Sequence, residues 1–157
     1  MREIVAMLDE SLTYLAHEIF DDYIIVVVES SRDEVPCPYC DKVSSRVHST
    51  YERSFQDLPI QGKKVYVSIL NRKYFCDNRN CPNTTFAESF VFLKPKSKKS
   101  ERLINEIMKL STEVSSVTAS RMLKDGVVDV SKSTICDMLK KNNKSIGQGR
   151  RRENLHR

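Results

Sequence analysis

Apolar residues in the first half of the chain follow patterns that predict β-strands. Residues 23–30 are rich in β-branched side chains, and residues 64–70 alternate between apolar and polar positions. Gln61-Gly62, directly before the second run, predicts a turn. A further strand is expected over residues 85–92, so this part of the chain is predicted to contain a β-hairpin.

Apolar residues spaced three and four positions apart predict helices at the two ends of the chain. One amphipathic helix is expected over residues 2–19, where Ile4, Met7, Leu8, Leu12, Leu15 and Ile19 would share a face. Three helices are expected over residues 100–145, and Gly126 would end the second of them. Their expected N-caps are Ser100, then Ser115 or Ser116, then Ser131.

Four cysteines in two close pairs predict a metal site. Cys37 and Cys40 are separated by two residues, and Cys76 and Cys81 by four. Two such turns can supply the four thiolates of a tetrahedral Zn²⁺ site, and four protein ligands leave no position for a substrate. One structural Zn²⁺ is therefore expected.

Other readings of the cysteines and histidines stay open at this stage. The four thiols could instead be unrelated buried groups or form disulfides, although an intracellular protein keeps thiols reduced. His48 lies between the pairs and is the histidine that could compete as a ligand. The fifth cysteine, Cys136, is expected to be a half-buried thiol of the third helix.

The charge of the chain is strongly asymmetric. Residues 1–35 hold two basic and nine acidic residues, whereas residues 36–157 hold 24 basic and 12 acidic residues. A basic region of this kind predicts a polyanionic partner, most simply double-stranded DNA, and the alternative is solvated surface charge. No apolar run approaches the ~18 residues of a membrane helix, and no secretory signal is recognised, so a cytoplasmic protein without a membrane partner is expected.

The predicted helices of residues 100–145 fit a helix-turn-helix, whose last helix presents its N-terminal side chains to base edges. Lys132, Ser133 and Thr134 hold those positions. The residues expected to meet phosphates are the cations Arg121, Lys140, Lys141, Lys96, Lys98, Lys99, Arg46 and Arg53. Because the connection from Leu123 to Lys132 is long for this motif, a helical bundle for protein contacts is the alternative. The stretch around Arg46 and Arg53 suits a solvated loop equally well.

These expectations define an α+β protein in which a small zinc-ribbon β module with an N-terminal helix precedes a three-helix helix-turn-helix module. The predicted parts are an N-terminal helix and strand packing on the ribbon, the ribbon itself, a basic linker, the helix-turn-helix domain and a basic tail. They span residues 1–34, 35–93, 94–99, 100–145 and 146–157.

Several motifs of the chain together resemble the N-terminal part of ISL3-family insertion-sequence transposases. The similar stretches, in order, are residues 37–40, 45–48, 51–53, 57–65, 72–76, 80–82 and 86–88. The resemblance implies that family's zinc-binding domain followed by its helix-turn-helix domain. It also implies a prokaryotic, nucleoid-associated protein that binds DNA, with terminal repeats as the expected sites.

In that family a catalytic domain with three metal-binding carboxylates follows the helix-turn-helix. Glu153 is the one acidic residue among residues 142–157. We therefore expect a DNA-binding protein that is not an enzyme and does not catalyse transposition, with a second copy or a full-length transposase as a possible partner. The alternative is a protein-interaction adaptor or transcriptional regulator that uses the same zinc ribbon.

Overall fold

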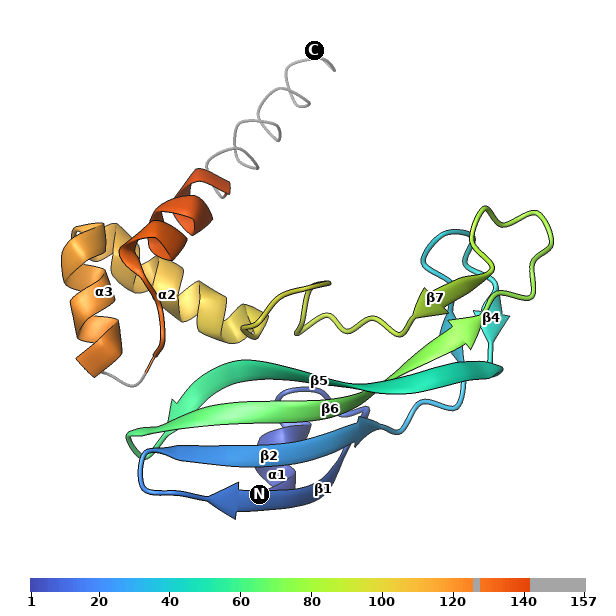
Figure 1. Cartoon of the computed structure of the whole chain (residues 1–157), viewed down its shortest axis with the longest axis horizontal. Coiled ribbons are helices and arrows are strands. Elements are labelled where there is room, and N and C mark those ends of the chain that lie inside the picture. Colours follow the sequence, from blue (N-terminus) through green and yellow to red (C-terminus); the bar gives the residue numbers. More distant parts are fainter. Residues whose placement is uncertain (126–127, 142–157) are drawn as a thin grey trace, which may run out of the picture. The chain divides into compact units, whose positions relative to one another are not determined.

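A computed structural model describes residues 1–125 and 128–141 of the chain (Figure 1). The chain divides into two compact units, Met1–Arg102 and Leu103–Arg157, and each is described by itself. The predicted helix stop at Gly126, the last residues of the predicted helix-turn-helix domain and the basic tail over 146–157 lie outside the described residues. The described residues form helices and strands, as expected of an α+β protein.

A mixed five-stranded sheet forms most of the first unit. Its order is β1-β2-β6-β5, with β7 paired to the far end of β6, and β2 runs parallel to β6 (Figure 1). The strands are β1 (Leu12–Ile19), β2 (Tyr23–Ser30), β5 (Val47–Ile60), β6 (Lys63–Phe75) and β7 (Thr85–Ala87). A separate two-stranded sheet pairs β3 (Val35–Pro36) with β4 (Val43–Ser44). The predicted strand over 23–30 is confirmed, and the one over 64–70 lies inside β6, whereas the one over 85–92 is strand only as far as Ala87.

The turn predicted at Gln61-Gly62 joins β5 to β6. Gln61 has φ 49° and Gly62 has φ 75°, and Ile60 pairs with Lys63 across them. Two successive positive φ values define the type of two-residue turn that matches the twist of a hairpin. The glycine is required here because its backbone adopts this region without a steric penalty.

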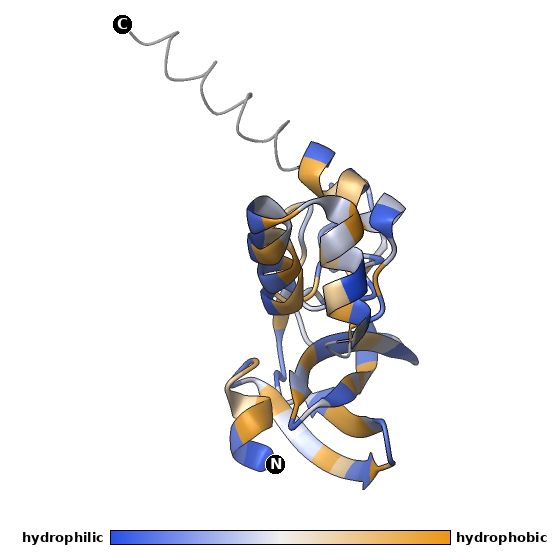
Figure 2. Ribbon diagram, turned by 90° about the vertical axis from the view of Figure 1, so that its left-hand side faces the viewer, coloured by the Kyte–Doolittle hydropathy of each residue, from blue (hydrophilic) through white to orange (hydrophobic). Residues whose placement is uncertain are grey.

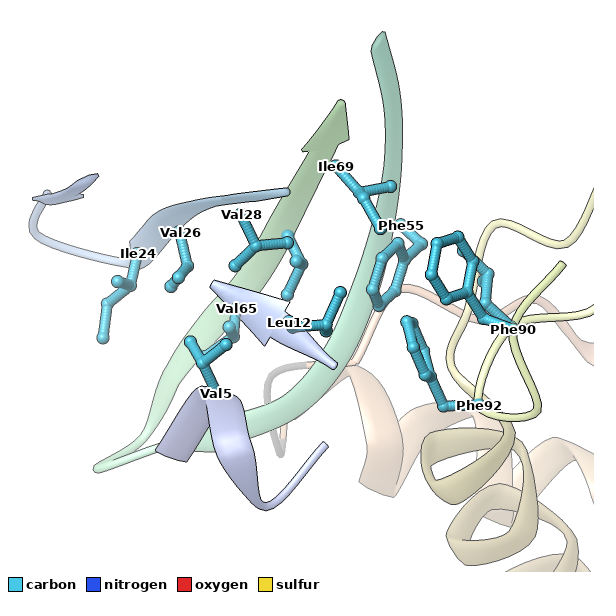
Figure 3. Close-up of a cluster of buried hydrophobic side chains, with 12 residues drawn as sticks. Val5, Leu12, Ile24, Val26, Val28, Phe55, Val65, Ile69, Phe90 and Phe92 are labelled. Carbon is cyan, nitrogen blue, oxygen red and sulfur yellow. The ribbon is translucent and has the colours of Figure 1, made fainter. Parts of the chain in front are cut away.

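The main hydrophobic core lies on one face of this sheet (Figure 3). The parallel pairing of β2 with β6 places Ile24 beside Val65, Val26 beside Val67 and Val28 beside Ile69. All six of these side chains are buried. Val5 of the short helix α1 (Arg2–Ala6), Leu12, Phe55 and the aromatic pair Phe90 and Phe92 pack against the same face.

The helix predicted over residues 2–19 is wrong beyond its first turns. α1 ends at Ala6, and residues 12–19 form β1 instead. Asp9 ends the helical region because its carboxylate accepts hydrogen bonds from the backbone N–H (2.8 Å) and the hydroxyl (2.6 Å) of Ser11, which forms a turn. Pairing of β1 with β2 then overrides the helical spacing of its apolar residues, and Leu15 and Ile19 are exposed.

Residues 94–99, predicted as a basic linker, are held against β5. The backbone N–H of Gln56 donates to the carbonyl of Lys98, and the N–H of Ser100 donates to the carbonyl of Gln56, both at 2.9 Å. The buried carboxylate of Asp57 accepts hydrogen bonds from the Ser100 hydroxyl (2.6 Å) and from Nε of Arg102 (2.8 Å). The segment is therefore part of the first unit, and its backbone extends the edge of the sheet.

Glu88, directly after β7, carries a buried carboxyl group. Glu88 accepts a hydrogen bond of 2.5 Å from the Ser30 hydroxyl and lies 3.8 Å from the Arg32 guanidinium, while its second oxygen has no hydrogen-bond partner among the described residues. Burial raises the pKa of Glu88 above its usual value, although Ser30 and the guanidinium groups of Arg32 and Arg72 oppose the shift. The ionised form of Glu88 therefore lowers the stability of the folded state.

The substitution Glu88→Gln is expected to stabilise the protein at neutral pH. A raised pKa means that the folded state prefers the protonated acid, so stability from this residue is present at low pH and is lost as pH rises through the folded-state pKa. The amide removes that loss, so thermal unfolding should occur at a higher temperature than in the wild type at pH 8 and at a similar temperature at pH 4. A destabilisation at pH 8 would show that the Arg32 and Arg72 contacts outweigh the cost of burial.

Helices form the described part of the second unit. They are α2 (Glu101–Glu113), whose first residues belong to the first unit, α3 (Ser116–Asp125) and a helical segment over residues 132–141. The predicted caps at Ser115 and Ser131 are confirmed, because their hydroxyls accept hydrogen bonds from the backbone N–H groups of Thr118 and Thr134. Figure 2 shows hydrophobic and hydrophilic residues interleaved along these helices. The described residues contain no helix that combines the length and the apolar character needed to cross a membrane.

Candidate metal centre and cationic surface

The first cysteine pair lies in the tight turn between β3 and β4. The backbone N–H of Cys37 donates to the carbonyl of Lys42 (3.0 Å), and the N–H of Asp41 donates to the carbonyl of Cys37 (2.9 Å). Asp41 has φ 58°, a conformation that aspartate adopts more readily than most residues. The closed turn holds Cys37 and Cys40 close together.

The second pair lies in the loop between β6 and β7. The N–H of Cys76 donates to the carbonyl of Thr84 (2.9 Å), and the N–H of Cys81 donates to the carbonyl of Asn78 (3.0 Å). The side chain of Asn78 also accepts from the N–H of Asn80 at 3.0 Å, which shapes the wide four-residue spacing. β6 ends at Phe75 and therefore leads directly into this turn.

The four sulfur atoms have the spacing that a tetrahedral zinc site requires. They all lie within 4.8 Å of one another, with 3.9 Å between Cys37 and Cys81 and 3.6 Å between Cys40 and Cys76. Zinc–sulfur bonds of about 2.3 Å in a regular tetrahedron place the sulfurs about 3.8 Å apart. The cysteine set therefore fits one structural Zn²⁺, which these residues would hold without an open coordination position.

The surroundings of the thiols shift their pKa values in opposite directions. A hydrogen bond from the backbone N–H of Lys42, followed by one from the Asn78 side chain, lowers the pKa of Cys40 to about 7. The backbone N–H of Asn78 acts to lower the pKa of Cys76, but burial and the neighbouring thiols raise it to about 12. Such a set releases its remaining protons when a cation compensates the repulsion between thiolates.

A small apolar cluster supports the site. Val35, Cys37, Tyr74 and Phe86 are buried together, and the rings of Tyr74 and Phe86 stack with centroids 5.9 Å apart. The other three site cysteines pack against this cluster. Because the cluster is small, the metal is expected to contribute much of the local stability.

His48 does not join the sulfur atoms. Its ring packs against Phe75 with centroids 4.8 Å apart, and its Nδ1 lies 2.9 Å from the Ser49 hydroxyl. The group of possible metal ligands found among the described residues contains the four cysteines and no histidine. Cys136 is half-buried in the helix over 132–141, with its sulfur 3.6 Å from the Ser116 hydroxyl. The structure therefore brings together the same four cysteines that the sequence predicts as zinc ligands.

Comparison with protein families agrees with this geometry. Residues 33–81 match the zinc-finger of transposase IS204/IS1001/IS1096/IS1165. The match contains all four cysteines, so this stretch is similar to an ISL3-type transposase zinc ribbon, and its cysteines form a site for one structural Zn²⁺. Searches of curated proteins and of solved structures gave no match.

Two of the predicted DNA-contacting cations, Arg46 and Arg53, already have partners within the chain. Arg46 forms an ion pair with Asp77, and its guanidinium lies 5.0 Å from the centroid of the Phe75 ring. Arg53 is half-buried and donates to the carbonyls of Lys94 and Ser97. These two arginines therefore have structural roles that the sequence did not indicate.

The predicted lysines of residues 94–99 differ in exposure. Lys96 and Lys98 are exposed, whereas Lys99 is half-buried. The backbone of this segment is fixed on β5, so its exposed lysines lie on an ordered edge of the first unit.

Most of the predicted cations of the second unit are exposed. Lys132 and Ser133 lie in the first turn of the helix over 132–141 and are exposed, whereas Thr134 is half-buried. Lys140 and Lys141 are exposed at the other end of the described helix, and Arg121 is exposed on α3.

Sequence reasoning missed Lys124, which is exposed on α3 three residues after Arg121. The three-residue spacing places both cations on one face of α3. This spacing can be read from the sequence and could have identified Lys124. The sequence does not show that the same face of α3 lies beside Lys132.

Proposed function

We propose that the chain is a transposase-type DNA-binding region, in which the zinc ribbon provides a metal-stabilised fold and the helices after it contact duplex DNA. The match of residues 33–81 to a transposase zinc finger carries this proposal. The excess of basic residues over residues 36–157 supports it, because the phosphate backbone is the simplest polyanion for such a region.

The proposed DNA-reading element is a helix-turn-helix made by α3 and the helix over 132–141. Ser131 caps the second helix, so the exposed side chains of Lys132 and Ser133 lie in its first turn, the part of a recognition helix that faces DNA. The connection between the helices is longer than usual, and its described residues 128–131 pack against α3. Val128 and Val130 are buried, and the N–H of Val128 donates to the carbonyl of Leu123 at 2.7 Å.

Binding of the zinc-loaded chain to duplex DNA should weaken steeply with salt. The logarithm of the association constant is expected to fall linearly with the logarithm of salt concentration, with a slope of about −0.9 for each phosphate contacted. Fluorescence anisotropy of a labelled duplex at several salt concentrations measures that slope. Absent binding, or affinity that does not change with salt, would contradict the proposal.

We further propose that the chain does not itself cut or join DNA. Among the described residues, the side chains that cluster as possible metal ligands are the four cysteines, without a carboxylate triad of the kind that a nuclease uses. In the binding experiment, a duplex incubated with the chain and Mg²⁺ should therefore stay intact.

The second candidate function is protein interaction through the N-terminal region. β1 is an edge strand, and Leu15 and Ile19 on it are 43% and 60% exposed. The net acidity of residues 1–35 makes DNA an unsuitable partner for this edge. A protein that stays bound to the chain after nuclease treatment would favour this function.

A further inference from the structure

A hollow on the second unit gathers three cationic side chains. It has a volume of about 300 Å³ and lies between α3 and the start of the helix over 132–141. Arg121 and Lys124 line it from α3, and Lys132 lines it from the other helix; Ser120 and Val117 complete its wall. The two helices are the orange and red ribbons of Figure 1.

The hydrogen bonds of the connecting segment fix this geometry. The buried Ser120 hydroxyl donates to the carbonyl of Val130 at 2.9 Å, directly before the Ser131 cap. The Val128–Leu123 hydrogen bond fastens the other end of the connection to α3. These two hydrogen bonds hold the described residues 128–131 against α3, and Lys132 follows them directly.

No described acidic residue compensates the charge of the hollow. Among the residues that the structure describes, Arg121, Lys124 and Lys132 form no ion pair, and no acidic residue lines the hollow. Cations held together in a concave surface raise the local positive potential, and an anion that enters relieves their repulsion. The planar guanidinium can make a bidentate contact with a phosphate, and each ammonium adds a point charge.

The size and the wall of the hollow favour a phosphodiester over a small ion. Val117 is 57% exposed and gives the cationic hollow an apolar edge. A DNA backbone offers the matching pair, a charged phosphate beside an apolar sugar surface. We propose that this hollow binds one phosphodiester group of duplex DNA through Arg121, Lys124 and Lys132, so that Lys132 contacts the backbone and not a base. The proposal rests on the DNA-binding function above and leaves base contact to Ser133 and Thr134.

The test uses the full zinc-loaded chain and labelled duplexes of about 20 base pairs with unrelated sequences. Arg121→Gln, Lys124→Gln and Lys132→Gln should each weaken binding by about tenfold, because each removes a charge-assisted hydrogen bond. The loss should be the same on every duplex, and the triple variant should reduce the magnitude of the salt slope by about one. Lys109→Gln is the matched control, since Lys109 is exposed on α2 and lies outside the hollow. It removes the same charge and should change affinity by less than about twofold.

The outcomes separate this proposal from the proposed function. If the wild type binds with a steep salt slope but the three variants behave like Lys109→Gln, the hollow is not a phosphate site and DNA binding stands. If Lys132→Gln weakens binding to one duplex and not to the others, Lys132 reads a base and the proposal is overturned. If the wild type binds no duplex at all, the proposed function and this site fail together.

Discussion

Replacing Cys76 with serine is expected to unfold the metal-binding end of the zinc ribbon, formed by β3, β4 and β7, while most of the five-stranded sheet stays folded. Structural zinc sites contribute about 10–16 kcal/mol of apparent binding free energy in peptide models, and the loss of one thiolate removes much of it. The apolar cluster around Val35, Tyr74 and Phe86 is too small to replace that contribution. The larger core on β2 and β6 contains none of the four cysteines, so it should remain.

Amide hydrogen exchange measures this local loss. In Cys76→Ser, protection should disappear over β3, β4 and β7 and persist over β2 and the first part of β6. Cys136→Ser is the matched control because Cys136 is a half-buried thiol outside the sulfur cluster. Retained protection of β3 and β4 in Cys76→Ser would mean that the ribbon folds without its metal.

Asp57→Ala is expected to destabilise the first unit by about 3 kcal/mol, because it removes the buried carboxylate of an ion pair with the half-buried Arg102, together with its hydrogen bonds. Asp57 is buried, and its loss leaves the Ser100 hydroxyl and the Arg102 guanidinium without this acceptor. The hydrogen bonds of Gln56 with residues 98–100 should weaken with it. Urea denaturation followed by circular dichroism gives the change in the free energy of unfolding.

The control for this substitution is Asp33→Ala, which makes the same change at an exposed position of the same unit. Its effect should stay within about 0.5 kcal/mol. Equal denaturation midpoints for the two variants would show that the contact of residues 98–102 with β5 does not stabilise the unit.

Features encoded by local spacing could be predicted from the sequence. The strand over 23–30 follows from its β-branched run, and the turn at Gln61-Gly62 follows from its turn residues. The zinc ligands follow from two cysteine pairs, each of which is held by its own turn. In all these cases the decisive residues lie within a few positions of one another.

Features that depend on contacts distant in sequence could not be predicted. Residues 12–19 have apolar positions with helical spacing, but their pairing with β2 makes them a strand. Residues 94–99 have no periodic pattern, because their backbone and not their side chains attaches them to β5. The hollow beside Lys132 likewise depends on a hydrogen bond between Ser120 and Val130, and no local motif indicates it.

Native mass spectrometry of the full chain tests the central claim most directly. We predict one Zn²⁺ on the wild type and on Cys136→Ser, and none on a variant in which Cys37, Cys40, Cys76 and Cys81 are all serine. A wild-type chain without zinc after purification in its presence, or zinc retained by the four-serine variant, would contradict the account.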